Sequence, residues 1–390
     1  MSNQSSRVTL HWYLPTYGDS RSIMAGGHGA GFHSSTREPS LDYLIQIAQA
    51  AEYNGFESLL TPTGSWCADA WLTTAALAAR TERLKFLVAF RPGLVSPTLI
   101  AQQALTFQDL FRNRLLLNVV VGGEDAEQRA YGDYLTKEQR YARASEALSI
   151  IRKLWTDDEP VTVDGEFQKV DQAQLSHHPS IEPTIFFGGS SQPGIESAAQ
   201  YADTYLTWGE PPAAAGEKIA RVRHVAEEFG RSLDYGVRLH VIARPTAEEA
   251  WSEAERMLEG IDPEQVRKVQ EGLAKSQSEG QRRMTALHNQ GGAFGEGSTA
   301  RDLEIYPGLW TGVGLVRGGA GTALVGSYDD VARLTKEYID QGFNHFILSG
   351  YPHLEETFHV GEGVVPALRR LGVDVKNHET SDTQDGEGRD

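Results

Sequence analysis

Cysteine and basic residues are scarce in this chain, and each shortage excludes a class of protein. Cys67 is the single cysteine among 390 residues, so neither an intramolecular disulfide nor a cysteine-based metal cluster can form. Lysine and arginine total 36 against 53 acidic residues, which gives a net charge of −17. Nucleic acids and anionic membranes bind clustered basic residues, so neither is expected as a partner.

Long apolar segments are also missing. No apolar run approaches the roughly 20 residues that a membrane-spanning helix needs. Residues 1–6 are polar and lack the apolar core of a secretion signal. Together with the lone cysteine, these absences predict a cytoplasmic protein.

Short apolar runs alternate with segments of helical spacing along most of the chain. Leu41–Tyr53, for example, repeats apolar residues every three or four positions. Eight such strands, each flanked by helices, predict an α/β fold, a (β/α)8 TIM barrel over residues 1–372. A doubly wound sheet is the alternative, although it usually has fewer strands and a phosphate motif after the first. The expected strands are residues 8–14, 57–60, 84–90, 115–121, 183–187, 204–207, 237–243 and 345–348.

Two long insertions interrupt this alternation, at residues 156–182 and 261–326. The second separates the seventh strand from the eighth and is rich in glycine, glutamine and arginine. Loops this long inside a compact domain are usually functional or disordered, so residues 261–326 are expected to form a mobile lid. Residues 373–390 are polar and acidic and are expected to be a disordered tail.

The residues at the C-terminal ends of the strands should form the site, because TIM-barrel sites lie there. They are rich in cations and hydrogen-bond donors and poor in carboxylates. A glycosidase needs a pair of carboxylates and a metallohydrolase needs clustered histidine and aspartate, and neither pattern is visible. We therefore expect a cofactor and no metal. The residues are Tyr17, Thr63, Cys67, Arg91, Asn118, Gly122, Ser190, Ser191, Trp208, Arg238, His240, Tyr351 and His353.

A glycine- and serine-rich turn follows the fifth strand. Gly188, Gly189, Ser190 and Ser191 lead into a helix, and backbone N–H groups at a helix N-terminus together with two hydroxyls can bind phosphate. The alternative is that the glycines only form the turn and Ser191 only caps the helix.

Two pairs of polar residues alternate near the ends of the last two strands. Arg238 and His240 point to the same face of the seventh strand, amid apolar neighbours. Burying a charge there is costly unless it is paired or faces a ligand, so either an anion site or a buried ion pair is expected. Tyr351 and His353 follow the eighth strand with the same spacing.

Sequence segments over residues 10–368 make the chain resemble the alkanesulfonate monooxygenases of the bacterial-luciferase-like flavin monooxygenase superfamily. The most specific are FGGSS at 187–191, LTWGEPP at 206–212, RLHVI at 238–242, QRRMTALH at 281–288 and LSGYPHLEE at 348–356. The resemblance implies a two-component system in which an NAD(P)H-dependent flavin reductase supplies reduced FMN. The protein would use that FMNH2 with O2 to cleave the carbon–sulfur bond of an organosulfonate, giving sulfite and an aldehyde. It also implies a homodimer or homotetramer.

The resemblance assigns roles position by position. FMN would be held by Thr63, Asn118, Arg140, Tyr141, Ser190 and Ser191, with the phosphate on the two serines. The sulfonate and the reactive face of the flavin would involve Trp208, Arg238, His240, Tyr351 and His353. Cys67 matches a cysteine near the flavin, and Arg317 lies in the loop expected to close the site.

The chain departs from the family pattern after its first strand. Tyr17 stands where the family motif Pro-Thr-His-Gly-Asp has histidine. Residues 20–38 form a longer and more polar insertion that adds His28, His33 and Arg37. It either selects a polar substrate such as the sulfosugar sulfoquinovose or is a surface insertion.

The sequence also fits other functions. The chain could be a related monooxygenase acting on a sulfone or a heterocycle. It could also be a flavin-binding protein without catalysis. A dehydrogenase that uses F420 would leave the sulfonate-type residues unexplained.

Overall fold

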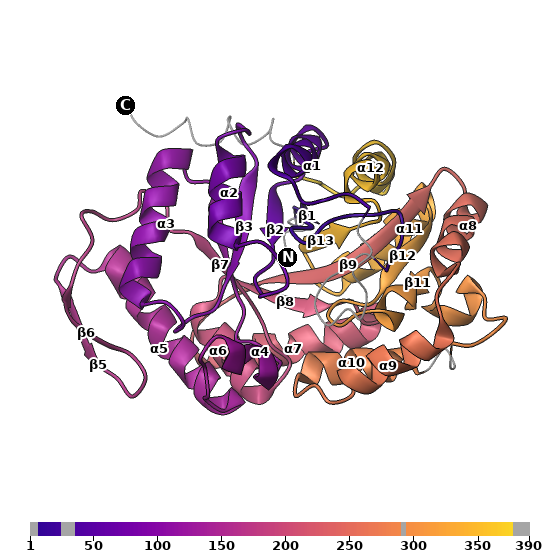
Figure 1. The fold of residues 1–390 in the computed structure, drawn as a ribbon. Coiled ribbons are helices and arrows are strands. Elements are labelled where there is room, and N and C mark those ends of the chain that lie inside the picture. The colour runs from indigo at the N-terminus through magenta and orange to yellow at the C-terminus, as the bar shows by residue number, and fades with distance from the viewer. Residues whose placement is uncertain (1–6, 25–35, 290–293, 377–390) are drawn as a thin grey trace.

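Eight parallel strands close into a barrel in the computed structural model, which describes residues 7–24, 36–289 and 294–376 (Figure 1). The order is β1–β2–β3–β4–β7–β8–β9–β13, and β13 pairs with β1 to close the ring. The predicted TIM barrel is thus confirmed. The strands are β1 (Thr9–Tyr13), β2 (Ser58–Thr61), β3 (Lys85–Phe90), β4 (Leu115–Val119), β7 (Thr184–Gly188), β8 (Thr204–Trp208), β9 (Asp234–Arg244) and β13 (His345–Ser349).

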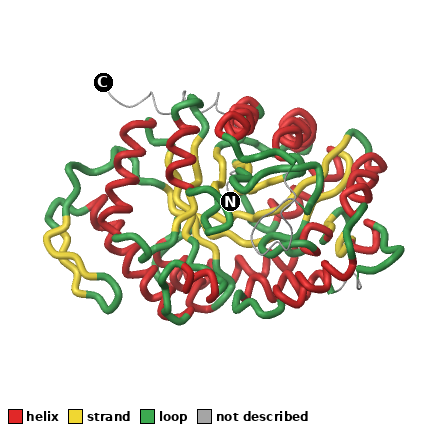
Figure 2. The backbone as a smooth tube through the Cα atoms, viewed as in Figure 1, coloured by secondary structure: helices red, strands yellow, loops and turns green. Residues whose placement is uncertain are grey.

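Helices surround the strands, as the backbone trace shows (Figure 2). Local sequence signals start several of them: Ser40 accepts a hydrogen bond from the backbone of Tyr43, and Thr136 forms a capping box with Gln139. The helices are α1 (Leu41–Tyr53), α2 (Ala70–Ala78), α3 (Pro97–Phe111), α4 (Asp125–Ala130), α5 (Lys137–Thr156), α6 (Gln192–Tyr201), α7 (Pro212–Glu228), α8 (Ala247–Leu258), α11 (Tyr328–Asp340), α12 (His353–Phe358) and α13 (Val365–Arg370), with the π-helical η3 (His359–Val364) between the last two.

The barrel interior is filled with side chains and is not a pore. Tyr13, Leu60, Leu87, Leu116 and Phe186 form a cluster inside it together with Ile347. A larger cluster lies between the strands and the helices. The interior cluster forms a solid base, so a ligand can enter only beyond it, toward the strand ends.

The two insertions contain regular structure. Residues 156–182 include a hairpin of β5 (Val161–Asp164) and β6 (Lys169–Ala173), which projects beyond α5 (Figure 1). Within residues 261–326, β12 extends the sheet by pairing in parallel with the C-terminal half of β9. Residues 290–293 lie outside the described residues. Movement of the whole insertion, residues 261–326, stays a prediction. Its elements are α9 (Pro263–Leu273), α10 (Glu279–His288), η1 (Ala300–Leu303), β10 (Glu304–Tyr306), β11 (Leu309–Trp310), η2 (Gly312–Leu315) and β12 (Ala323–Ser327).

The first residues of the expected C-terminal tail belong to the barrel. Val373 and Val375 are buried, and Val375 bridges to Val8 beside the first strand. The rest of that tail, residues 377–390, lies outside the described residues. Among the helices that the structure describes, none is long and apolar enough to cross a membrane.

Candidate functional site

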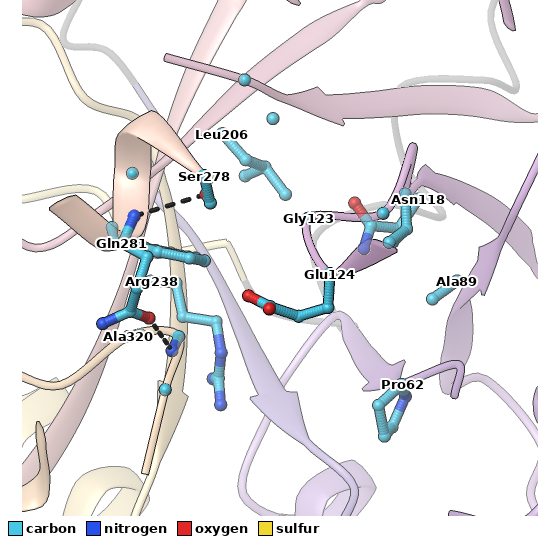
Figure 3. Close-up of a pocket in the computed structure, with 18 of the residues that line it drawn as sticks. Pro62, Ala89, Asn118, Gly123, Glu124, Leu206, Arg238, Ser278, Gln281 and Ala320 are labelled. Atoms are coloured by element: carbon cyan, nitrogen blue, oxygen red, sulfur yellow. Dashed lines mark hydrogen bonds between the residues drawn. The ribbon is translucent and has the colours of Figure 1, made fainter. Parts of the chain in front are cut away.

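A cavity of about 330 Å³ lies at the C-terminal ends of the strands. Strand ends line it together with residues 276, 278–281 and 317–320 of the long insertion (Figure 3). The insertion therefore covers the mouth of the barrel. The residues singled out from the sequence that line the cavity are Thr63, Arg91, Asn118, Gly122, Tyr141, Ser190, Ser191, Trp208, Arg238 and Arg317.

The turn between β7 and α6 forms a cradle for an anion. Ser191 occupies the N-cap position of α6 without a capping hydrogen bond, and its Oγ is buried with no hydrogen-bond partner among the described residues. A Cβ at Gly189 would lie 3.0 Å from the Cα of Gly194 and 3.3 Å from the Oη of Tyr141, so a larger residue would crowd the turn. Free N–H groups at a helix N-terminus and an unsatisfied hydroxyl fit a phosphate group.

A wall of polar and apolar side chains leads from this cradle toward the barrel axis. Thr63 and Asn118 lie in the cavity lining beside the apolar side chains of Leu60, Ala89 and Leu206. A few polar groups at the edge of an apolar wall suit a flat heterocycle.

Arg140 does not line the cavity. Its buried guanidinium pairs with Asp125 at 3.0 Å and donates to the carbonyl of Leu135 at 2.8 Å. Its place on α5, one position before Tyr141, turns it toward α4 and away from the cavity.

Arg238 points into the barrel from β9. Its register partners are Trp208 on β8 and Ile347 on β13, both inward-facing. Its guanidinium lies 4.0 Å from the ring centroid of Tyr13, and no carboxylate of the described residues pairs with it. Nη1 is buried, and no described residue forms a hydrogen bond with it. Burial lowers the pKa of Arg238, so the site holds a cation that lacks a counterion.

Arg317 brings a second guanidinium to the cavity from the long insertion. It donates to the Oη of Tyr17 at 3.0 Å and lies 3.0 Å from Nε2 of His240. The other ring nitrogen of His240, Nδ1, lies 2.7 Å from the Oγ of Ser349. Burial and the two cations lower the pKa of His240 well below its usual value, so the ring is neutral at neutral pH.

Tyr351 and His353 lie behind the cavity lining. Both are buried, and Tyr351 stacks on His240 with ring centroids 5.6 Å apart. Among the described residues, neither the Oη of Tyr351 nor Nε2 of His353 has a hydrogen-bond partner. The Nδ1 of His353 pairs with Asp19 at 2.9 Å.

Cys67 also lies outside the cavity lining. Its Sγ contacts the carbonyl oxygen of Gly64 at 3.4 Å, and burial raises the pKa of the thiol to about 11. It is therefore a neutral thiol at physiological pH and a weak nucleophile.

Sequence reasoning missed several polar residues of the cavity lining, among them Glu124 and Gln281. The carboxylate of Glu124 extends into the cavity between Asn118 and Gln281 (Figure 3) and has no hydrogen bond or ion pair among the described residues. Gln281 accepts a hydrogen bond from the backbone N–H of Gly319 at 3.0 Å, which links α10 to the loop of Arg317. The position of Glu124 just beyond β4 could have revealed it.

A buried ion cluster ties the insertion to the barrel. Glu210, which follows β8, pairs with Lys218 on α7 and with Arg283 on α10. Burial alone would raise the pKa of Glu210, but these two cations lower it. Removing Glu210 would leave the buried ammonium of Lys218 without a counterion.

The polar insertion after β1 contributes a different anchor. Arg37 pairs with Glu355 on α12 at 2.6 Å and does not reach the cavity. His28 and His33 lie outside the described residues, so a role of this insertion in substrate selection stays a prediction.

Comparisons with known proteins match this architecture. Residues 21–345 match the family model described as luciferase-like monooxygenase. The structure of long-chain alkane monooxygenase (LadA) has a TM-score of 0.74 at 19% identity, covering 94% of this chain and 92% of that one. EDTA monooxygenase (EmoA) from Chelativorans sp. BNC1 has a TM-score of 0.70 at 18% identity over 94% and 95%.

The same fold also occurs with another cofactor. An F420-dependent secondary alcohol dehydrogenase has a TM-score of 0.64 at 18% identity, covering 93% of this chain and 99% of that one. At such identities these likenesses establish the fold and not the substrate. The family match covers most of the chain, which therefore belongs to the luciferase-like monooxygenase family.

Proposed function

We propose that this protein is a reduced-FMN monooxygenase that cleaves organosulfonates with O2. The observation that carries the proposal is Arg238, a half-buried arginine in the cavity wall whose Nη1 is buried and which has no carboxylate partner among the described residues. A planar guanidinium binds the oxygens of an oxyanion in a bidentate manner. A sulfonate is such a ligand, and it would supply the charge that the site lacks.

The cavity also fits FMN. The orphaned Ser191 hydroxyl and the N-terminus of α6 would hold its phosphate, and Tyr141 lies against the same turn. Thr63 and Asn118 would meet the polar edge of the ring system. Arg140 would act only indirectly, by holding α5 against α4 through Asp125. Bound reduced FMN supplies the two electrons that, with O2, convert RCH2SO3⁻ to RCHO, HSO3⁻ and water while FMN is released oxidised.

The protein's own residues would bind the sulfonate and exclude water. Arg238 and Arg317 would bind the sulfonate oxygens, and Trp208 would cover the substrate from the end of β8. A Cβ at Gly280 would lie 3.1 Å from the Trp208 ring, so the insertion packs closely over this side. Excluding water protects reactive flavin chemistry from side reactions.

Sulfite release tests the proposal. The purified protein would be mixed with a flavin reductase, NADH and FMN, and supplied with short alkanesulfonates, sulfoquinovose or the neutral dimethyl sulfone. We expect stoichiometric sulfite with at least one sulfonate and loss of that activity in Arg238→Ala. Turnover of the sulfone alone, unaffected by Arg238→Ala, would instead identify a monooxygenase of neutral substrates.

A further inference from the structure

A chain of hydrogen bonds runs from the protein surface to His353 behind the cavity. Glu355 accepts two hydrogen bonds from Arg37, at 2.6 and 2.7 Å. Arg37 lies 2.9 Å from the Oη of Tyr43, and that hydroxyl donates to Oδ2 of Asp19 at 2.6 Å. Asp19 in turn contacts Nδ1 of His353 at 2.9 Å. Asp19 and His353 are both fully buried.

The contacts of Asp19 settle its charge. Oδ1 faces the backbone N–H of Ser20 and Nδ1 of His353, whereas Oδ2 faces the backbone N–H of His353 and the Tyr43 hydroxyl. The two backbone groups and Arg37-bound Tyr43 are donors, so both oxygens act as acceptors. Burial alone would raise the pKa of Asp19, but these contacts lower it. Asp19 is therefore ionised.

An ionised Asp19 fixes the tautomer of its neighbour. The ring nitrogen that faces the carboxylate must carry the proton, so Nδ1 of His353 is protonated. Burial and the charges of Arg317 and Arg238 lower the pKa of His353, although Asp19 opposes them. The ring is then neutral, and Nε2 presents a lone pair that no described residue engages. His353 is thus a proton acceptor at Nε2 and not an extra donor.

We propose that Asp19 is a positioning residue that holds His353 as a neutral proton acceptor behind the sulfonate-binding arginines. The catalytic part of this inference rests on the proposed function, because the oxidation removes a proton from the carbon next to sulfur. Nε2 of His353 would accept a proton delivered from the site and later return it to water. The Tyr43–Arg37–Glu355 chain couples this residue pair to the polar insertion after β1.

Several titratable groups surround this histidine and enter its pH dependence. Tyr13 from β1 and Tyr351 from the β13–α12 turn contact its ring, with centroids 5.9 and 5.2 Å away. Arg238, from β9, and Arg317, from the long insertion, act on it through their charges. Asp19 is the anion that faces Nδ1.

Nitrogen NMR of the full-length protein labelled with ¹⁵N-histidine tests the residue pair without flavin or substrate. His353 is assigned by the signal that disappears in His353→Gln. We expect a neutral Nδ1–H tautomer in the wild type. In Asp19→Asn the tautomers should mix and the pKa of His353 should fall, because the carboxylate charge is gone. An Nε2–H tautomer in the wild type, or an unchanged tautomer in Asp19→Asn, would overturn the proposal.

Two further variants keep the test decisive. Tyr43→Phe removes one donor to Asp19 and should raise the pKa of His353 while keeping the proton on Nδ1, which gives an answer even if Asp19→Asn misfolds. Asp133→Asn removes another buried carboxylate, which pairs with Arg143 outside the cavity, and should leave the His353 signal unchanged.

Turnover tests the catalytic part. With a sulfonate substrate, Asp19→Asn should lower kcat about 100-fold, in the range of lost general acid–base catalysis, with little change in KM. The pH at which kcat falls on the acidic side should shift with the measured pKa of His353. Unchanged kcat despite an altered tautomer would overturn the catalytic role. If the wild type oxidises no sulfonate, the proposed function and the catalytic role fail together. The NMR experiment still shows whether Asp19 holds His353 in the neutral Nδ1–H tautomer.

Discussion

Nη2 of Arg317 lies 3.0 Å from Nε2 of His240, although the two residues are 77 positions apart in the sequence. A guanidinium can only donate, so Nε2 accepts and Nδ1 donates to Ser349. The carbonyl oxygen of Ala320 lies at the same 3.0 Å from Nε2 and would accept a proton there. Removing Arg317 from this contact therefore favours the other tautomer, in which His240 bonds Ala320.

Arg317→Gln tests this relationship. A charge-assisted hydrogen bond to a ligand contributes about 1.5–3 kcal/mol, so sulfonate affinity should fall roughly 10- to 100-fold. The pKa of His240 should rise, because the nearby cation that lowers it is gone. Isothermal titration with an alkanesulfonate and histidine NMR measure the two effects. Unchanged affinity would place the sulfonate away from Arg317.

Arg238→Met should stabilise the protein while it abolishes function. Methionine fills a similar volume without a buried charge, and such replacements commonly stabilise proteins. The lost contact with Tyr13 offsets part of the gain, so we expect about 1 kcal/mol more unfolding free energy in urea. Sulfonate binding should become undetectable. A large loss of stability would instead mean that the guanidinium has a structural partner.

Much of this fold can be read from the sequence, because local signals mark the eight barrel strands and the starts of several helices. Short apolar runs identify the eight strands, and the alternation of Arg238 and His240 correctly places both side chains inside the barrel. The C-terminal strand ends then identify Ser191, Asn118 and Trp208 as lining residues. These positions depend on backbone register, which the pattern of apolar residues sets.

Side-chain partners cannot be read in the same way. Arg140 turns from the cavity because Asp125 lies within reach, and Asp19 meets His353 across 334 positions. The glycine-rich stretch before β12 looks flexible by composition. Most of it is buried, with Gly314 and Gly321 making room for the ring of His288, and its movement stays a prediction. Such contacts depend on tertiary packing, which composition does not encode.

Ser191→Ala should distinguish FMN from riboflavin. The lost hydroxyl would weaken FMN about 10-fold, the cost of a hydrogen bond to a charged group, and would leave the phosphate-free riboflavin unaffected. Anaerobic titration of the reduced flavins measures both. Gly189→Ala, which places a Cβ 3.0 Å from the Cα of Gly194, should also weaken the binding of FMN more than that of riboflavin. Equal losses of affinity for FMN and riboflavin would mean that the phosphate binds elsewhere.

His288 should make the fold sensitive to acid. Both ring nitrogens are buried without a partner in the part of the chain that the structure describes, and burial lowers the pKa of His288 from 6.5 to about 4. As pH falls below 6.5 the unfolded chain takes up the proton first, so stability is lost between pH 6.5 and about 4. His288→Gln removes this dependence. Between pH 6.5 and about 4, the unfolding free energy of the wild type should therefore fall by up to about 3 kcal/mol more than that of His288→Gln.

Glu356 acts in the opposite direction over part of the same range. Burial raises its pKa to about 7, so its protonation favours the folded state and its contribution is lost as pH rises through 7. Both proteins carry Glu356, so the difference between them isolates His288. If the unfolding free energies of the two proteins change in parallel with pH, His288 is hydrated in the folded wild type and its pKa is not lowered by burial.

Glu124→Gln should change which sulfonates the enzyme accepts. The carboxylate of Glu124 faces the same cavity as Arg238 (Figure 3), so it repels a second negative charge on the substrate. The test compares a sulfocarboxylate with a sulfonate of equal length that has a neutral tail. In the variant, the ratio of their kcat/KM values should shift about 10-fold toward the sulfocarboxylate, since about 1.4 kcal/mol corresponds to a factor of ten. Glu279→Gln serves as a control, because Glu279 also lines the cavity but already pairs with Arg282. A substrate ratio unchanged by Glu124→Gln, together with weaker flavin binding, would assign this carboxylate to the flavin.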